Sequence, residues 1–192
     1  MRGACTQVFL AEAFLLQTIS VAIRNEMNNC RANLKSIGLS IILAGIAAGI
    51  VSTLIQMLLW LIFTDGLPAI LYRDARLTAA VVLGISVLPP PATFDATVML
   101  VATFIHFSLS VIYAALLASI AAFLKSVSAF LLGIGFGGML YLVNLYGFTM
   151  IFPWFNQTRG WITLIAHGVF GLTAILVYQG LNARVSVKNA QC

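Results

Sequence analysis

The sequence predicts an all-α membrane protein: a bundle of four transmembrane helices, with a short re-entrant or interfacial helix in the first outer loop. Charged residues make up only 8 % of its 192 residues and hydrophobic residues 61 %, whereas a soluble domain is typically about 25 % charged. The mean hydropathy of +1.05 also indicates a membrane protein. A transmembrane helix takes about 20 residues, so a chain of this length can hold four helices and their loops. Six helices would leave almost no residues for the connections between them.

Long stretches without Asp, Glu, Lys or Arg locate the four spans. Each exceeds the roughly 18 apolar residues that indicate a membrane-crossing helix. Each must be helical, because backbone groups in lipid need partners within their own segment. The predicted spans are residues 37–63, 96–124, 127–152 and 161–181.

Prolines and aromatic residues mark the ends of these spans. Pro153 is expected to end the third span, and the prolines at 89–91 break the chain before the second. Aromatic side chains gather near the same ends, as in the belt at a membrane interface. The belt residues are Trp60, Phe63, Phe152, Trp154, Phe155 and Trp161.

Two other apolar stretches do not qualify as clear spans. Residues 77–88 are too short to cross and predict the re-entrant or interfacial helix. Residues 4–23 contain Gln7, Glu12 and Gln17, so a fifth span, an amphipathic segment and a poor signal sequence stay open, as does a true start at Met27. The expected organisation is an N-terminal cytoplasmic or amphipathic segment at 1–36, a membrane domain at 37–181 and a cytoplasmic tail at 182–192.

The basic residues favour one orientation of the bundle. With the segment before the first span inside, six Lys and Arg side chains face the cytoplasm and three face outward, as the positive-inside rule requires. The inner set is Arg24, Arg31, Lys35, Lys125, Arg184 and Lys188, and the outer set is Arg73, Arg76 and Arg159. Both termini are therefore expected in the cytoplasm. This orientation, rather than nucleic-acid binding, accounts for the formal charge of +5.

Each span has one small-and-polar face when its residues are placed about 100° apart. Gly45 and Gly49 form a G-x-x-x-G pattern that lets two helix backbones approach closely. Gly133 and Gly137 are expected to pack in the same way, because the glycine run around them lacks the strand and the Lys of a nucleotide loop. Polar groups are costly in lipid, so these faces are expected to point into the bundle.

Four hydrogen-bonding side chains fall at a similar depth, one on each span. They form a predicted polar layer of Gln56, His106, Asn144 and His167. Their separations of eight to eleven residues from the outer ends correspond to roughly 12 to 16 Å along a helix. The layer is therefore expected in the outer half of the bilayer, and it contains both histidines of the chain.

Three interpretations of this layer stay open. Its residues could simply join helices by hydrogen bonds, which fix helix register in membranes. They could relay protons or bind a small ligand, because ionisable groups at this depth are functional by default. His106 and His167 could instead be the axial ligands of a b-type haem.

Other chemistry is not indicated by the sequence. No carboxylate or thiol accompanies the histidines at depth, so no other metal site is expected. The cysteines, Cys5, Cys30 and Cys192, form no CxxC pair and lie near the chain ends, which disfavours a disulfide framework or a zinc site. No nucleophile with a matching base is recognisable. We therefore expect no catalytic residue and no enzymatic activity.

Several short motifs occur in a recognisable order. The first span contains AGIAAGIVS, the second contains HFSLSVIY at 106–113, the third ends in FPWF, and the fourth contains AHG at 166–168. Over residues 37–181 this order resembles the YagU-like family of small bacterial inner-membrane proteins of unknown function. The resemblance implies a bacterial inner membrane and a four-helix unit, and it implies no reaction. The chain departs from the pattern at Gln56, where a charged residue is expected.

These observations predict a non-enzymatic, multi-pass inner-membrane protein with an accessory role in assembly, stress tolerance or small-solute handling. The alternatives are a bis-histidine b-type cytochrome and a subunit of a small oligomeric channel or transporter. A symporter built from two inverted repeats needs more helices than four. The expected partners are the lipid bilayer and either further copies of the chain or another membrane protein, without nucleic acid. No cofactor is expected unless the histidines bind haem.

Overall fold

The computed structural model describes the backbone of residues 2–124 and 126–190 and the side chains at 26, 34–124 and 126–183. It divides into two compact units, Met1–Leu39 and Ser40–Cys192. The first unit is helical from residue 2 and belongs to α1, which is a helix over Arg2–Phe63. The expectations for residues 4–23 and for a start at Met27 concern side chains outside the described residues.

The second unit is helical in every regular element that the structure describes. After residues 40–63 of α1 come α2 (Ala69–Leu83), a 3₁₀ turn (Ile85–Val87), α3 (Ala96–Phe123) and α4 (Ala129–Leu142). A π-helical segment (Val143–Gly147) and two 3₁₀ segments (Phe148–Met150 and Pro153–Thr158) lead to α5 (Trp161–Ala190). Four helices are long and apolar enough to cross a membrane: Leu34–Phe63, Ala96–Phe123, Ala129–Met150 and Trp161–Ala183. The predicted all-α fold with four spans is confirmed.

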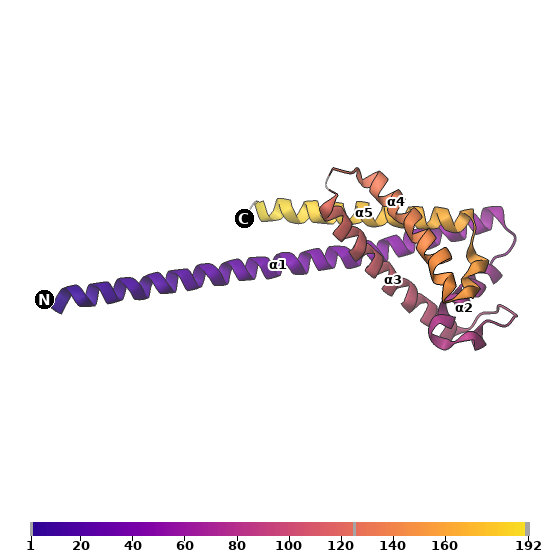
Figure 1. The fold of residues 1–192 in the computed structure, drawn as a ribbon, viewed down its shortest axis with the longest axis horizontal. Coiled ribbons are helices and arrows are strands. Elements are labelled where there is room, and N and C mark those ends of the chain that lie inside the picture. Colours follow the sequence, from indigo (N-terminus) through magenta and orange to yellow (C-terminus); the bar gives the residue numbers. More distant parts are fainter. Residues whose placement is uncertain (1, 125, 191–192) are drawn as a thin grey trace. The chain divides into compact units, whose positions relative to one another are not determined.

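The spans of the second unit, whose order along the chain can be followed in Figure 1, pack through small residues and a common apolar core. Gly45 of α1 lies against the backbone of α3 at Ser110 and Val111. Gly133 of α4 lies against the backbone of α5 at Leu172. Between the helices is a buried cluster formed by Ala48, Leu117, Leu132, Phe136, Leu140, Phe170, Ala174 and Ile175.

The short helix was predicted with the wrong bounds. The structure places α2 at Ala69–Leu83, whereas the apolar stretch alone indicated 77–88. Its first half contains charged residues and was therefore not recognised, although Ala75 and Ala79 pack with Val98 of α3 in a buried cluster. The helix ends at Gly84, whose φ of 82° suits glycine.

The third span is also less regular than predicted. A single helix was expected over 127–152, but the α-helix ends at Leu142 and continues as π-helix and 3₁₀ turn. Side-chain donors compete for the backbone there: the Leu145 carbonyl accepts from Arg159 Nε at 2.7 Å and from Thr149 Oγ1 at 3.1 Å. A carbonyl shared in this way no longer requires regular α-helical pairing.

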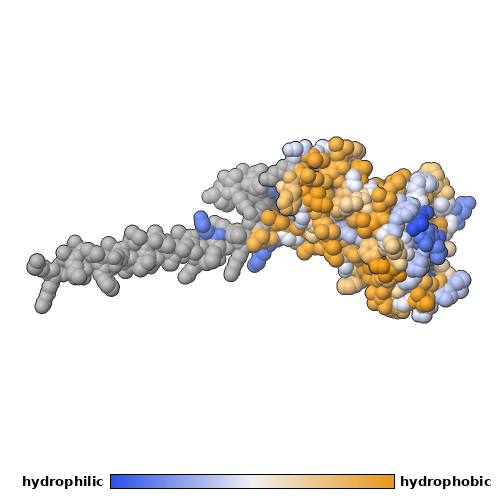
Figure 2. Space-filling view, in the orientation of Figure 1, coloured by the Kyte–Doolittle hydropathy of each residue, from blue (hydrophilic) through white to orange (hydrophobic). Residues whose placement is uncertain are grey.

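The surface of the second unit has the distribution of a membrane protein. Figure 2 shows hydrophobic residues over most of this unit and hydrophilic residues gathered at the end that carries α2. Large apolar side chains on the spans are highly exposed, including Leu100, Phe104 and Phe123. Such an extent of exposed apolar surface indicates contact with lipid. The chain is therefore a multi-pass membrane protein.

Candidate functional site

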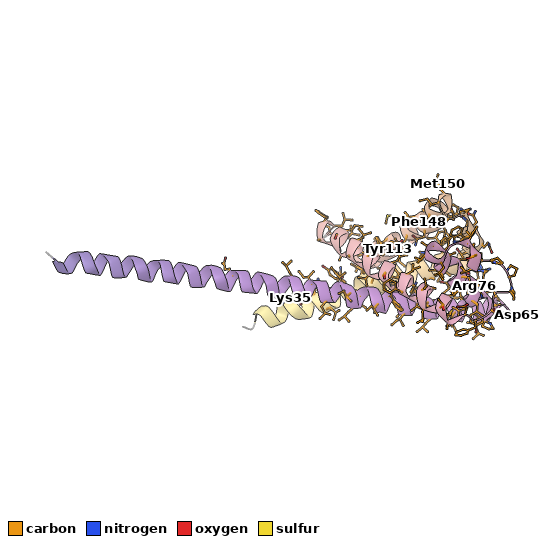
Figure 3. The ribbon with its side chains drawn as sticks, turned by 90° about the horizontal axis from the view of Figure 1, so that it is seen from below. Lys35, Asp65, Arg76, Tyr113, Phe148 and Met150 are labelled. Carbon is orange, nitrogen blue, oxygen red and sulfur yellow. The ribbon has the colours of Figure 1, made fainter. Side chains whose placement is uncertain are left out.

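Three of the four residues of the predicted polar layer, His106, Asn144 and His167, lie in two hydrogen-bonded clusters within the second unit. One joins α1 to α3 around His106, and the other joins α3, the π-helical segment and α5 around Asn144 and His167. Tyr113 belongs to the second cluster, and Figure 3 shows it away from the end of the unit at which Asp65 and Arg76 lie. Both clusters lie inside the membrane-spanning segments.

The first cluster forms where α1 and α3 come close together. His106 Nε2 lies 3.3 Å from Thr53 Oγ1 and 3.4 Å from the Gly49 carbonyl oxygen. Gly49 makes this approach possible, because a Cβ atom there would lie 3.2 Å from His106 Nε2 and 2.9 Å from Ser110 Oγ. Ser110 Oγ in turn donates to the His106 carbonyl at 2.8 Å. The imidazole thus fills the space that the glycine leaves open.

The second cluster is a chain of hydrogen bonds across three segments. The Tyr113 hydroxyl donates to Asn144 Oδ1 at 2.7 Å, and Asn144 Nδ2 donates to His167 Nε2 at 3.3 Å. His167 Nδ1 donates to the Thr163 carbonyl at 2.8 Å. With Nδ1 as donor and Nε2 as acceptor, all three bonds are consistent with one neutral tautomer of His167.

The π-helical segment positions Asn144 in this chain. A π-helical turn holds one more residue than an α-helical turn and often occurs at functional sites. Asn144 is the second residue of the segment and bonds to both neighbouring helices. The sequence placed Asn144 at the right depth, but it contained no signal for the change in helix type.

Gln56 does not join either cluster. Its side chain is half-buried on α1, three residues after Thr53. Among the described residues it makes no hydrogen bond to the other members of the predicted layer. Thr53 instead provides the α1 hydroxyl that meets His106.

Three of the four glycines predicted to pack helices lie where two backbones approach, whereas Gly49 faces the side chains of His106, Phe107 and Ser110. A Cβ atom at Gly45 would be 2.7 Å from Val111 Cα, and one at Gly133 would be 2.7 Å from Leu172 Cα. At Gly137 it would collide with the His167 carbonyl oxygen. The glycine at 137 therefore sets the distance between α4 and the helix turn that carries His167.

Both ring nitrogens of His167 and Nε2 of His106 are engaged in hydrogen bonds within the bundle. Axial ligation needs a ring nitrogen of each histidine to be available to the iron. His106 Nε2 is instead directed at Thr53 and Gly49, and His167 Nε2 accepts from Asn144 while Nδ1 donates to Thr163. Within the described part of the chain, no group of three or more His, Cys, Asp or Glu side chains could hold a metal ion.

Arg159 is a residue whose role the sequence did not reveal. It was expected to mark the outer interface, but its guanidinium also holds the end of the third span. Arg159 Nε donates to the Leu145 carbonyl at 2.7 Å and Nη2 lies 3.0 Å from Thr149 Oγ1. Its Cζ lies 4.2 Å from the centre of the Tyr146 ring. The separation of 14 residues between Arg159 and Leu145 hides this contact from any helical pattern.

Comparison of the chain with protein-family models, with curated proteins and with solved structures returns no match.

Proposed function

We propose that this protein is a non-enzymatic, accessory component of the bacterial inner membrane, in which the polar layer joins the helices. The observation that supports this proposal is that Nε2 of each histidine is hydrogen-bonded within the bundle. His106 meets Thr53 and Gly49 of α1, and His167 meets Asn144 of the third span. Through these bonds the two imidazoles connect neighbouring helices.

The energies of such contacts suit a structural role. Hydrogen bonds between membrane helices contribute about 0.6 kcal/mol on average and up to about 1.7 kcal/mol. Leaving a polar group in the same apolar surroundings without a partner costs more. The clusters therefore contribute modestly to stability while strongly disfavouring other registers of α3, α4 and α5.

The charge distribution supports an orientation with both termini in the cytoplasm. Arg73 and Arg76 lie in α2 and Arg159 just before α5, and Asp65, Asp74 and Asp95 occur in α2 and the connections on either side of it. More Lys and Arg residues occur in the N-terminal flank, the connection between α3 and α4 and the C-terminal tail, which are the segments expected in the cytoplasm. The resemblance to YagU-like proteins supports a location in the bacterial inner membrane.

Substitution of His167 separates a structural role from a chemical one. His167→Gln keeps a side chain that can accept from Asn144, whereas His167→Leu leaves the Asn144 amide without that acceptor. We expect the Gln variant to keep the wild-type thermal midpoint in detergent. If deletion of the gene impairs growth, this variant should restore growth to the deletion strain. The Leu variant should be less stable, by about 1 kcal/mol. A folded Gln variant that fails to restore growth would show that the imidazole itself is required.

Reconstitution tests the alternative of a small oligomeric channel or transporter. Liposomes containing the purified protein and a trapped pH-sensitive or ion-sensitive dye should show the same ion leak as empty liposomes. A protein-dependent flux that His167→Gln abolishes would contradict the proposal and favour transport through the polar layer.

A further inference from the structure

A pocket of about 160 Å³ opens at the end of the second unit that carries α2. Its walls come from the end of α1, the start of α2 and the residues on either side of the start of α5, and they include Arg73, Gln157 and Arg159. The four residues of the predicted polar layer are not among its lining residues. An engineered cavity of about 150 Å³ holds a benzene molecule, so this pocket has room for a group of the size of phosphate.

Arg159 lines this pocket, and its positive charge rests on the Tyr146 ring rather than on a carboxylate. The groups that hold its Nε and Nη2 atoms are the Leu145 carbonyl and the Thr149 hydroxyl, both neutral. Among the described residues no carboxylate lies within ion-pairing distance of it, and its Nη1 atom has no protein partner. A guanidinium fixed in this way keeps two N–H groups for an acceptor and loses little entropy on binding it.

Arg73 contributes a second guanidinium from α2. Its Nε and Nη2 atoms both bind Asp74 Oδ1, at 2.9 and 2.7 Å. Nη1 makes no hydrogen bond in the part of the chain that the structure describes. Asp74 also lines the pocket, so the three charged side chains of the wall sum to one positive charge. That balance favours an anion of low charge.

The pocket lies beside aromatic side chains of the kind found at membrane interfaces. Trp60 and Trp161 line it, and the exposed Phe63 packs edge-on against Trp161 with ring centres 5.0 Å apart. Tryptophan favours the level of the lipid headgroups. An anion at this level could belong to a lipid or be dissolved in the adjacent water.

We propose that this pocket binds a phosphate group between Arg73 and Arg159. Arginine pairs well with phosphate because its planar donors match the oxygen geometry. One of the two available Nη1 groups comes from α2 and the other from the turn before α5, so the bound group links these segments. The two sources with this chemistry are an anionic phospholipid headgroup and free phosphate.

Thermal unfolding of the full-length protein in a neutral detergent tests the proposal. The probes are inorganic phosphate, dioleoyl phosphatidylglycerol and dioleoyl phosphatidylcholine, with ionic strength held constant by sodium chloride. A ligand that binds the folded state raises the unfolding midpoint in a concentration-dependent way. We expect at least one of phosphate and phosphatidylglycerol to raise it more than phosphatidylcholine does.

Gln157→Glu is the decisive variant, because it adds a negative charge to the pocket wall without removing an arginine contact. We expect it to weaken binding by about tenfold. Gln179→Glu makes the same change at an exposed position far along α5 and should bind as the wild type does. Arg73→Gln removes one proposed donor and should also weaken binding.

The outcomes distinguish the two sources and can overturn the site. A shift with phosphatidylglycerol alone assigns the pocket to a lipid headgroup, and a shift with inorganic phosphate shows that the free ion suffices. Absence of a shift with both probes overturns the proposal. The proposal is also overturned if the ligand raises the unfolding midpoint of Gln157→Glu as much as that of Gln179→Glu and the wild type, because binding would then occur outside this pocket.

Discussion

The crossing of α4 and α5 allows a sharp test of the packing in this bundle. A Cβ atom at Gly133 would lie 2.7 Å from Leu172 Cα, 2.9 Å from the Gly171 carbonyl oxygen and 2.9 Å from Ile175 Cγ2. The first two are backbone atoms and cannot rotate away, so Gly133→Ala must separate the two helices. Overpacking of this kind costs about 1 to 3 kcal/mol.

Gly135 supplies the matched control on the same helix. A Cβ atom there meets nothing within 4 Å. Alanine is a better helix former than glycine by about 1 kcal/mol, so Gly135→Ala should be neutral or stabilising. The same gain offsets part of the cost at Gly133, which leaves an expected net loss of up to about 2 kcal/mol.

Thermal unfolding in detergent, followed by circular dichroism, measures both variants. For a chain of this size 1 kcal/mol corresponds to a change of about 2 to 4 °C in the midpoint. Gly133→Ala should unfold at a lower temperature than the wild type, and Gly135→Ala at an equal or higher one. Equal midpoints for the two variants would refute the close approach of α4 and α5.

Three further outcomes are expected. Burial raises the pKa of Asp74 above its ordinary value of 3.8, and the nearby Arg73 only partly opposes this. The native state then holds the proton more tightly than the unfolded chain, so stability should fall as the pH rises from about 3.8 through the native pKa. Asp74→Asn should flatten that part of the pH profile of stability. In a cysteine-free background, Ser86→Cys should react with an impermeant reagent from the periplasm and Ala183→Cys should not; the reverse pattern would invert the orientation. The purified protein should be colourless, whereas a Soret band lost on His106→Gln would revive the cytochrome alternative.

The spans were predictable because the signal for them is local. Charged residues are nearly absent from membrane-crossing segments, so the gaps between charges located all four helices to within a few residues. The same signal misjudged α2, whose first turns contain Arg73, Asp74 and Arg76 although the helix packs on α3. Hydropathy identifies contact with lipid, and it does not identify a helix that lies against other protein.

The polar layer shows what depth along a helix can and cannot establish. A rise of about 1.5 Å per residue places His106, Asn144 and His167 at comparable levels. Which of them meet depends on the pairing and rotation of the helices, and these depend on backbone approaches such as that at Gly137. Depth alone therefore suggested four partners, whereas the structure unites Asn144 with His167 and gives His106 a hydroxyl on α1 instead.

The connection between α3 and α4 separates two pairs of spans, each joined by close backbone contacts of its own. Gly45 brings α1 onto α3, and Gly133 brings α4 onto α5. If the chain were cut in this connection, each fragment would still carry two segments able to insert as a helical hairpin. The two fragments could still associate through the apolar core and the hydrogen bond from Tyr113 to Asn144. The two halves, produced from separate reading frames, should therefore reassemble in the membrane.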